Sequence, residues 1–150
     1  MRNVWLLVIG AAIGGSATLA GAQALQRINP PGVSAPTTYS HIVRAGKTVY
    51  IAGQVGSDAQ GKITGAGMKE QVEQVLTNLR AVLKSQGLDA SHVAKINIFT
   101  TSIDEFRAPD VAAIRAKFFG DARPASTLVQ VVRLADPAYK VEIEAIAVAP

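Results

Sequence analysis

The longest regular pattern in this sequence is an amphipathic stripe between Met68 and Gln86. Its apolar residues recur three and four apart and are Val72, Val75, Leu76, Leu79, Val82 and Leu83. Residues at this spacing share one face of a helix, so the pattern predicts a helix with one buried side that ends at Gly87. A helix of this kind must pack on another layer of structure, which constrains the rest of the chain.

The segments around this helix alternate or run apolar as strands do. We expect strands at residues 41–45, 48–55, 93–100, 127–134 and 140–148. A second helix is predicted at residues 109–119, with Pro109 in its first turn, and Gly46-Lys47 suits a tight turn between the first two strands. The order β-β-α-β-α-β-β predicts an α+β domain with two helices on one face of a mixed sheet. Apolar side chains on the bare face are best buried against copies of the same chain, so we infer a homo-oligomer.

The first 24 residues have the pattern of a secretory signal peptide. A short positive start at Met1-Arg2-Asn3 precedes an uncharged, mostly apolar run over residues 4–19, and Ala22 and Ala24 each end an Ala-x-Ala site. We expect cleavage after Ala22 or Ala24 and a periplasmic product. The alternative is an uncleaved membrane anchor, because about 20 uncharged residues can just cross a bilayer.

The remainder divides into an arm and one domain. Residues 25–38 contain three prolines and little periodicity, so we interpret them as a linker or irregular N-terminal arm, followed by a single folded domain at residues 39–150. The chain has no cysteine, which excludes disulfides and thiol catalysis. Its 15 basic residues are scattered, so no nucleic-acid partner is expected. His41 and His92 lack acidic or cysteine neighbours at ligand spacing, so we expect both at the surface and no metal site.

Three residues, Glu142, Tyr39 and Gly53, are candidate functional residues, and Glu144 lies beside the first of them in the same predicted strand. Glu142 and Glu144 lie two apart in a predicted strand and therefore point to the same face. They are either a solvent-facing pair or, in a half-buried interface, include a general base that orients water. Tyr39 either packs where the first strand begins or contacts a ligand. Gly53 lies inside a strand, which suggests a bulge or a close approach of the backbone to a ligand or a neighbouring subunit.

Several blocks of sequence resemble one known family. They are the start Thr38-Tyr39-Ser40, the strand Ala52-Gly53-Gln54, the helix at residues 75–83, and the C-terminal stretches 123–134 and 141–148. Together they are similar to the RidA (YjgF) family of imine deaminases over residues 36–148. The resemblance implies a chorismate-mutase-like domain that assembles as a homotrimer with clefts between subunits. It also implies hydrolysis of enamines and imines, such as 2-iminopropanoate, to 2-oxo acids and ammonia without a cofactor.

The resemblance assigns roles to particular residues. Tyr39 would line the cleft, Gly53 would offer its backbone, and Glu142 would position the attacking water. Catalytic members read Pro-Ala-Arg and hold the substrate carboxylate with the arginine, whereas this chain has Ser126 in the substrate-binding position. A guanidinium binds a carboxylate through two parallel charged hydrogen bonds that a hydroxyl cannot reproduce. Ala52 and Leu128 likewise replace a serine and a cysteine seen in many members.

Two functions remain open at this point. One is an enamine or imine deaminase whose activity is altered or reduced because Ser126 replaces the arginine, with substrates that lack a carboxylate as one option. The other is a non-catalytic trimer that binds a small ligand or a partner in the periplasm. A ribonuclease activity, reported for some relatives, is not expected from a chain with no basic stripe and few aromatic residues.

Overall fold

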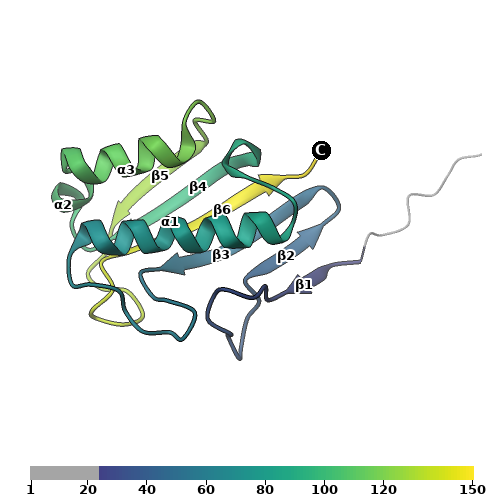
Figure 1. Ribbon diagram of the computed structural model, residues 1–150, viewed down its shortest axis with the longest axis horizontal. Coiled ribbons are helices and arrows are strands. Elements are labelled where there is room, and N and C mark those ends of the chain that lie inside the picture. Colours follow the sequence, from purple (N-terminus) through teal and green to yellow (C-terminus); the bar gives the residue numbers. More distant parts are fainter. Residues whose placement is uncertain (1–23) are drawn as a thin grey trace, which may run out of the picture.

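The structure of this chain is a computed structural model that describes residues 24–150 (Figure 1). The predicted signal segment lies outside the described residues except for Ala24, which is exposed. No helix in the described part of the chain is long and apolar enough to span a membrane.

A six-stranded mixed sheet forms one layer of the fold. Its strands are β1 (Gln26–Ile28), β2 (Ile42–Ala45), β3 (Thr48–Val55), β4 (Val93–Thr100), β5 (Ala125–Gln130) and β6 (Val141–Val148). They lie in the order β1-β2-β3-β6-β4-β5, and all neighbours are antiparallel except β4 and β5. The β2–β3 hairpin turns at Gly46, whose φ of 64° favours glycine. This arrangement confirms the predicted α+β class with a mixed sheet.

The helices form the second layer. They are α1 (Met68–Ser85), α2 (Ile103–Arg107) and α3 (Pro109–Phe119), with a short 3-10 turn η1 (Ala90–His92) before β4. Figure 1 shows α1 and α3 on the same side of the sheet, and α1 packs on β3 and β6. The sequence therefore predicted both long helices and the face that they share.

Three local features were not predicted. The N-terminal arm contains β1, which pairs with β2 at one edge of the sheet. The short helix α2 forms because the Ser102 side chain accepts a hydrogen bond from Glu105 N at 3.2 Å and Phe106 is fully buried. Strand β5 ends at Gln130 rather than residue 134, and the Val132 side chain beyond it is fully exposed.

The core lies between the helices and one face of the sheet. Alternate residues of β6, namely Val141, Ile143, Ala145 and Ala147, are buried there. The stripe of α1 covers them and its Val72, Val75, Leu79 and Val82 are fully buried. Burying each such valine, leucine or isoleucine contributes about 1.5 to 3 kcal/mol, so this face accounts for much of the folding free energy.

The opposite face of the sheet carries no helix in the described chain. Tyr50, Val129 and Val148 project from it with 48%, 43% and 45% of their surface exposed. Large apolar groups on an uncovered face are characteristic of an interaction surface. We call this surface, formed by the even-numbered residues of β6 and their neighbours on β3, β4 and β5, the open face.

Candidate functional site

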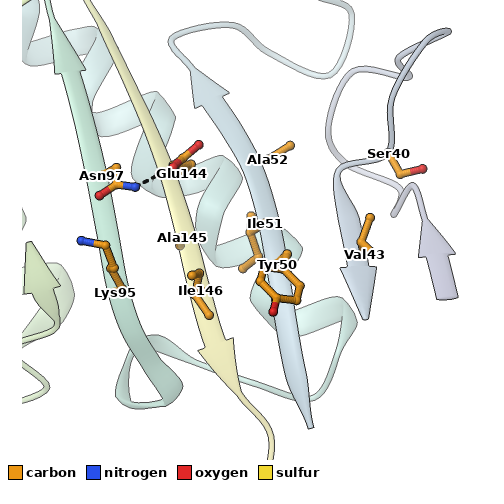
Figure 2. A pocket seen from close by; sticks show the side chains of 10 residues that line it. All are labelled: Ser40, Val43, Tyr50, Ile51, Ala52, Lys95, Asn97, Glu144, Ala145 and Ile146. Carbon is orange, nitrogen blue, oxygen red and sulfur yellow. Dashed lines mark hydrogen bonds between the residues drawn. The ribbon is translucent and has the colours of Figure 1, made fainter. Parts of the chain in front are cut away.

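Strand alternation places both glutamates of β6 on the open face. Glu142 lies opposite Val55 of β3 and Phe99 of β4, while Glu144 lies opposite Asn97. Asn97 Nδ2 donates a hydrogen bond to Glu144 Oε1 at 2.6 Å, which Figure 2 shows as a dashed line. No comparable donor is bonded to Glu142 within residues 24–150, so the two carboxylates have different environments.

A bulge in β3 creates the space that Glu142 occupies. Ile51 pairs with Ala145 and Gln54 pairs with Ile143, so Ala52 and Gly53 together face one residue of β6. A Cβ atom on Gly53 would lie 1.8 Å from Glu142 Oε1. The predicted bulge is confirmed, and the group that approaches the Gly53 backbone is the Glu142 carboxylate of the same chain.

The environment of Glu142 favours its protonated form. Burial raises the pKa of Glu142 above its ordinary value, and the nearby charge of Glu144 raises this pKa further. A carboxylate with a raised pKa is a stronger base once it is ionised, which suits it to accept a proton from water. Of the two glutamates, Glu142 is therefore the one whose environment departs from that of an ordinary surface carboxylate.

Tyr39 lies close enough to Glu142 for the negative charge of the carboxylate to oppose ionisation of the phenol. Burial raises the pKa of the Tyr39 phenol, and the Glu142 charge and then Tyr139 raise this pKa further. The Tyr39 side chain remains 54% exposed, so its hydroxyl can still meet a ligand. Tyr139, in the loop before β6, was not identified from the sequence because nothing in the local pattern places that loop beside Tyr39.

Ser126 is not part of this group within one chain. It lies in the edge strand β5 opposite Ile96, whose side chain is in the core. Paired residues of adjacent strands share a face, so Ser126 points to the helix side of the sheet, whereas Glu142 points to the open face. Strand β4 also separates β5 from β6. The structure thus brings together Tyr39, Gly53 and Glu142 and leaves Ser126 apart.

Only one of the two histidines lies at the surface, where both were expected. His92 is partly exposed, but the prediction that His41 lies at the surface is wrong, because this residue is only 3% exposed. The N-terminal arm covers it: His41 Nε2 lies 2.6 Å from Ser34 O, and Asn29 Oδ1 accepts a hydrogen bond from His41 N at 2.8 Å. Because the arm shows little periodicity in the sequence, this cover was not predictable.

Two hollows lie beside the strands and loops that carry the candidate residues, although Tyr39, Gly53 and Glu142 themselves line neither of them. The first, of about 290 Å³, lies on the open face and is shown in Figure 2; Tyr50 and Ile146 border it together with Asn97 and Glu144. The second, of about 500 Å³, is lined by the loop before β6, including Arg133, Tyr139 and Lys140. Ser40 and Ala52, which are next in sequence to Tyr39 and Gly53, line the first hollow, and Lys140, two residues before Glu142, lines the second.

Comparison with known proteins identifies the family. A family model described as Endoribonuclease L-PSP matches residues 31–149. The 2-iminobutanoate/2-iminopropanoate deaminase of Capra hircus is 38% identical over 111 residues, which are 73% of this chain and 79% of that protein. This chain belongs to the RidA family. The fold agrees, because RidA from an Antarctic Psychrobacter superposes with a TM-score of 0.75 at 33% identity and covers 82% of this chain and 98% of that one.

Further RidA relatives extend the same comparison. The human 2-iminobutanoate/2-iminopropanoate deaminase is 34% identical over 119 residues, covering 79% of this chain and 83% of that protein. Escherichia coli TdcF, solved with bound serine, superposes with a TM-score of 0.73 at 28% identity and covers 83% of this chain and 99% of that one. The matched region spans 79–99% of these relatives, and the family model covers residues 31–149, so the RidA domain accounts for most of the described chain.

Proposed function

We propose that this RidA-family protein hydrolyses the C=N bond of small imines, or of enamines through their imine tautomers, and releases ammonia and a carbonyl compound. The observation that carries this proposal is the placement of the Glu142 carboxylate over the Gly53 bulge, half-buried and beside Tyr39. Relatives named as deaminases of 2-iminobutanoate and 2-iminopropanoate, at 34–38% identity, support the same chemistry.

The proposed reaction needs one base that later acts as an acid. The Glu142 carboxylate accepts a proton from water as the water oxygen bonds to the carbon of a protonated imine. The resulting carbinolamine collapses when its nitrogen takes that proton from Glu142 and leaves as ammonia, and loss of the hydroxyl proton gives the carbonyl. The raised pKa of Glu142 suits both roles, because a group with a pKa nearer to neutrality exchanges protons more readily in both directions.

We further propose that the preferred substrates lack a carboxylate. Ser126 stands where the resemblance expects the arginine that holds this group, and hydrogen bonds to charged groups are worth about 1.5 to 3 kcal/mol. Loss of the arginine then weakens productive binding of an imino acid by roughly 10- to 150-fold. An imine without a carboxylate does not suffer this loss.

The site is proposed to be completed by assembly into a homotrimer. Within one chain Ser126 and Glu142 lie on opposite faces of the sheet and on strands separated by β4. The open face carries half-exposed Tyr50, Val129 and Val148, which a neighbouring copy would bury. Clefts between copies would bring β5 of one subunit near β6 of another.

We also propose that the protein is exported to the periplasm. The N-terminal pattern supports this, and cleavage after Ala22 or Ala24 would leave β1, which begins at Gln26, intact in the mature chain. Mass spectrometry of protein recovered from the periplasm checks the expected new N-terminus at residue 23 or 25. Recovery of the full-length chain in membranes would favour the uncleaved anchor.

A second candidate function is a trimer that binds a small ligand or a partner without turnover. The specific observation in its favour is Ser126, because the loss of the arginine removes a group on which imino-acid turnover relies in the family pattern. In this case Tyr39 and Glu142 serve as ligand contacts rather than as catalytic groups.

The deciding experiment measures ammonia release above the spontaneous rate by the purified mature protein. One imine is 2-iminopropanoate made in place by an amino-acid oxidase, and the other is an imine without a carboxylate made by an amine oxidase. Glu142→Gln is the test variant and Glu144→Gln is the matched control, because both change one carboxylate on the same face of β6. Hydrolysis is supported if only Glu142→Gln abolishes release. Equal rates for wild type, Glu142→Gln and the blank on both imines reject catalysis and favour the binding protein.

A further inference from the structure

A buried polar cluster lies behind the candidate site. His41 immediately precedes β2, and Gln54 lies in β3. The two residues are 3% and 2% exposed. Gln54 Nε2 lies 3.1 Å from His41 Nδ1 and also donates to Ala52 O at 2.8 Å. Two polar side chains placed in the interior without access to water must satisfy each other's hydrogen bonds.

The hydrogen-bond directions in this cluster follow from the chemistry of the groups. An amide nitrogen can only donate, so Gln54 Nε2 directs one hydrogen to Ala52 O and the other to His41 Nδ1. His41 Nδ1 is therefore the unprotonated ring nitrogen. Its partner Nε2 then carries the hydrogen and donates it to Ser34 O at 2.6 Å. A single His41 tautomer thus accounts for all three of these side-chain hydrogen bonds.

The cluster fixes the part of the backbone that carries Gly53. Ala52 O accepts from Gln54, and Ala52 N donates to His41 O at 2.9 Å, so the peptide groups of the bulge are held on two sides. The next residue, Gly53, is the one against which the Glu142 carboxylate packs. The His41 ring also meets the Tyr39 ring edge to face, with centroids 5.7 Å apart.

We propose that His41 is a positioning residue of the site: by accepting the Gln54 hydrogen bond it holds the Ala52–Gly53 bulge in the shape that seats Glu142. The inference rests on the proposed function in that Glu142 and Gly53 form the site. It goes beyond that function because it assigns a role to a buried pair that touches no substrate. Without an acceptor at Nδ1, one buried amide hydrogen of Gln54 has no partner, and the Gln54 side chain must turn away from Ala52 O to find one.

Two substitutions of His41 separate the bonds made by the two ring nitrogens. In His41→Asn the side-chain oxygen takes the place of Nδ1 and still accepts from Gln54, while the bond to Ser34 is lost. In His41→Gln the terminal amide nitrogen takes the place of Nε2 and keeps the bond to Ser34 O, while the acceptor for Gln54 is lost. We expect His41→Asn to keep most of the turnover. We expect His41→Gln to lower kcat by roughly 10-fold or more with little change in KM, because a misplaced base slows the chemical step.

A second readout does not depend on turnover. The pH titration of the Glu142 side-chain carboxyl, followed by carbon-13 NMR, reports how this group is seated. We expect His41→Gln to bring the pKa of Glu142 down toward its ordinary value, because a relaxed bulge admits water, whereas His41→Asn leaves the pKa raised. Thermal unfolding of each variant shows whether it is folded. If His41→Gln does not fold, Gln54→Met, which removes the same bond from the other side, takes its place.

The outcomes are distinct. A changed Glu142 titration in His41→Gln but not in His41→Asn supports the proposal. Equal titrations and equal kcat in both variants and wild type overturn it, as does a loss confined to His41→Asn, which would assign the role to the arm instead. Absence of turnover in the wild type counts against the proposed function alone, since the titrations still decide whether His41 positions Glu142.

Discussion

The two parts of the candidate site differ in how they are built. At the Glu142 corner, a bulge, a glycine and the polar cluster of His41 and Gln54 combine within one chain to seat a half-buried carboxylate. At the Ser126 edge, the hydroxyl lies on an exposed outer strand and faces the other side of the sheet. The first part is assembled within one chain, and Ser126 stands apart from it.

This difference teaches where function is constrained by folding and where it is free to change. At the Glu142 corner the groups are packed against one another, so a change at Gly53 displaces the Glu142 carboxylate. Altering residue 126 changes an exposed side chain, and exposed substitutions usually shift stability by no more than about 0.5 kcal/mol. On the proposed function, substrate preference would therefore vary at the Ser126 edge while the Glu142 corner is retained.

The largest effect on activity is expected when a substitution fills the space that the Glu142 carboxylate occupies beside Gly53. In Gly53→Ala the new Cβ would clash with Glu142 Oε1, so we expect it to displace the carboxyl group toward solvent. Because the displaced atoms belong to a side chain, we expect a small loss of stability and a fall in kcat of about 10²- to 10⁴-fold, the usual contribution of a general base.

A double-mutant cycle with Glu142→Gln tests this explanation of the Gly53→Ala effect. Gly53→Ala should add almost nothing to the loss already caused by Glu142→Gln, because both remove the same base. Additive losses would show that Gly53 acts through something other than Glu142.

A charge on the open face is expected to prevent assembly. Ile146 lies between Tyr50 of β3 and Lys95 of β4, in the middle of this face. A lysine buried there would lie beside the like charge of Lys95 and have no partner, which costs about 3 to 5 kcal/mol per site, so Ile146→Lys should yield monomers in light scattering at micromolar concentrations. Ala113→Lys introduces the same charge at an exposed position on α3 and should leave the assembly unchanged. A wild-type chain that is already monomeric would refute the proposed trimer.

At the Ser126 edge, we expect a substitution to raise activity rather than lower it. Ser126→Arg restores the guanidinium, and we expect kcat/KM for 2-iminopropanoate to rise by roughly 10- to 150-fold. The imine without a carboxylate should be unaffected or disfavoured. Ser126→Gln, which is long and polar but uncharged, is the control for size. Equal rates for Ser126→Arg and wild type on both imines would show that residue 126 does not contact the substrate.

Much of the fold was predictable because its signals are local. The α1 stripe, Pro109 at the start of α3 and the alternation along β6 each depend on residues a few positions apart, and the structure has these elements within one residue of their predicted bounds. Strand β1 and helix α2 were missed because their stability comes from partners distant in sequence or from a single capping side chain. Patterns in a window of sequence do not register such contacts.

The candidate site was predictable only in part, for the same reason. The shared face of Glu142 and Glu144 follows from strand alternation, and a glycine inside a strand indicates the bulge at Gly53. The difference between the two glutamates does not follow, because it depends on Asn97 bonding one of them and on the bulge receiving the other. His41 was misjudged because its burial is caused by the arm, through Ser34 and Asn29, and no periodic pattern indicates that cover.

The smallest expected effect concerns the pH dependence of stability. The folded protein raises the pKa of Glu142, mainly by burial, so between the unfolded and folded pKa values the native state binds more protons than the unfolded state. Stability then falls as pH rises through this window, and the penalty is complete above the folded pKa. Glu142→Gln removes the penalty, so its melting temperature should exceed that of wild type at pH 7 and approach it near pH 4.

The size of this gain in melting temperature, and the control variant for it, follow from the causes of the raised pKa of Glu142. Glu142 is only half-buried, so water screens part of its charge and the gain should amount to a few degrees at most. Glu144→Gln removes the second cause of the raised pKa but not the first, so it should reduce the pH dependence without abolishing it. A melting temperature of Glu142→Gln that is below wild type at pH 7 would mean that the carboxylate stabilises the fold. The Glu142 corner would then be a structural feature like the core beneath it, and the contrast between the two parts of the site would disappear.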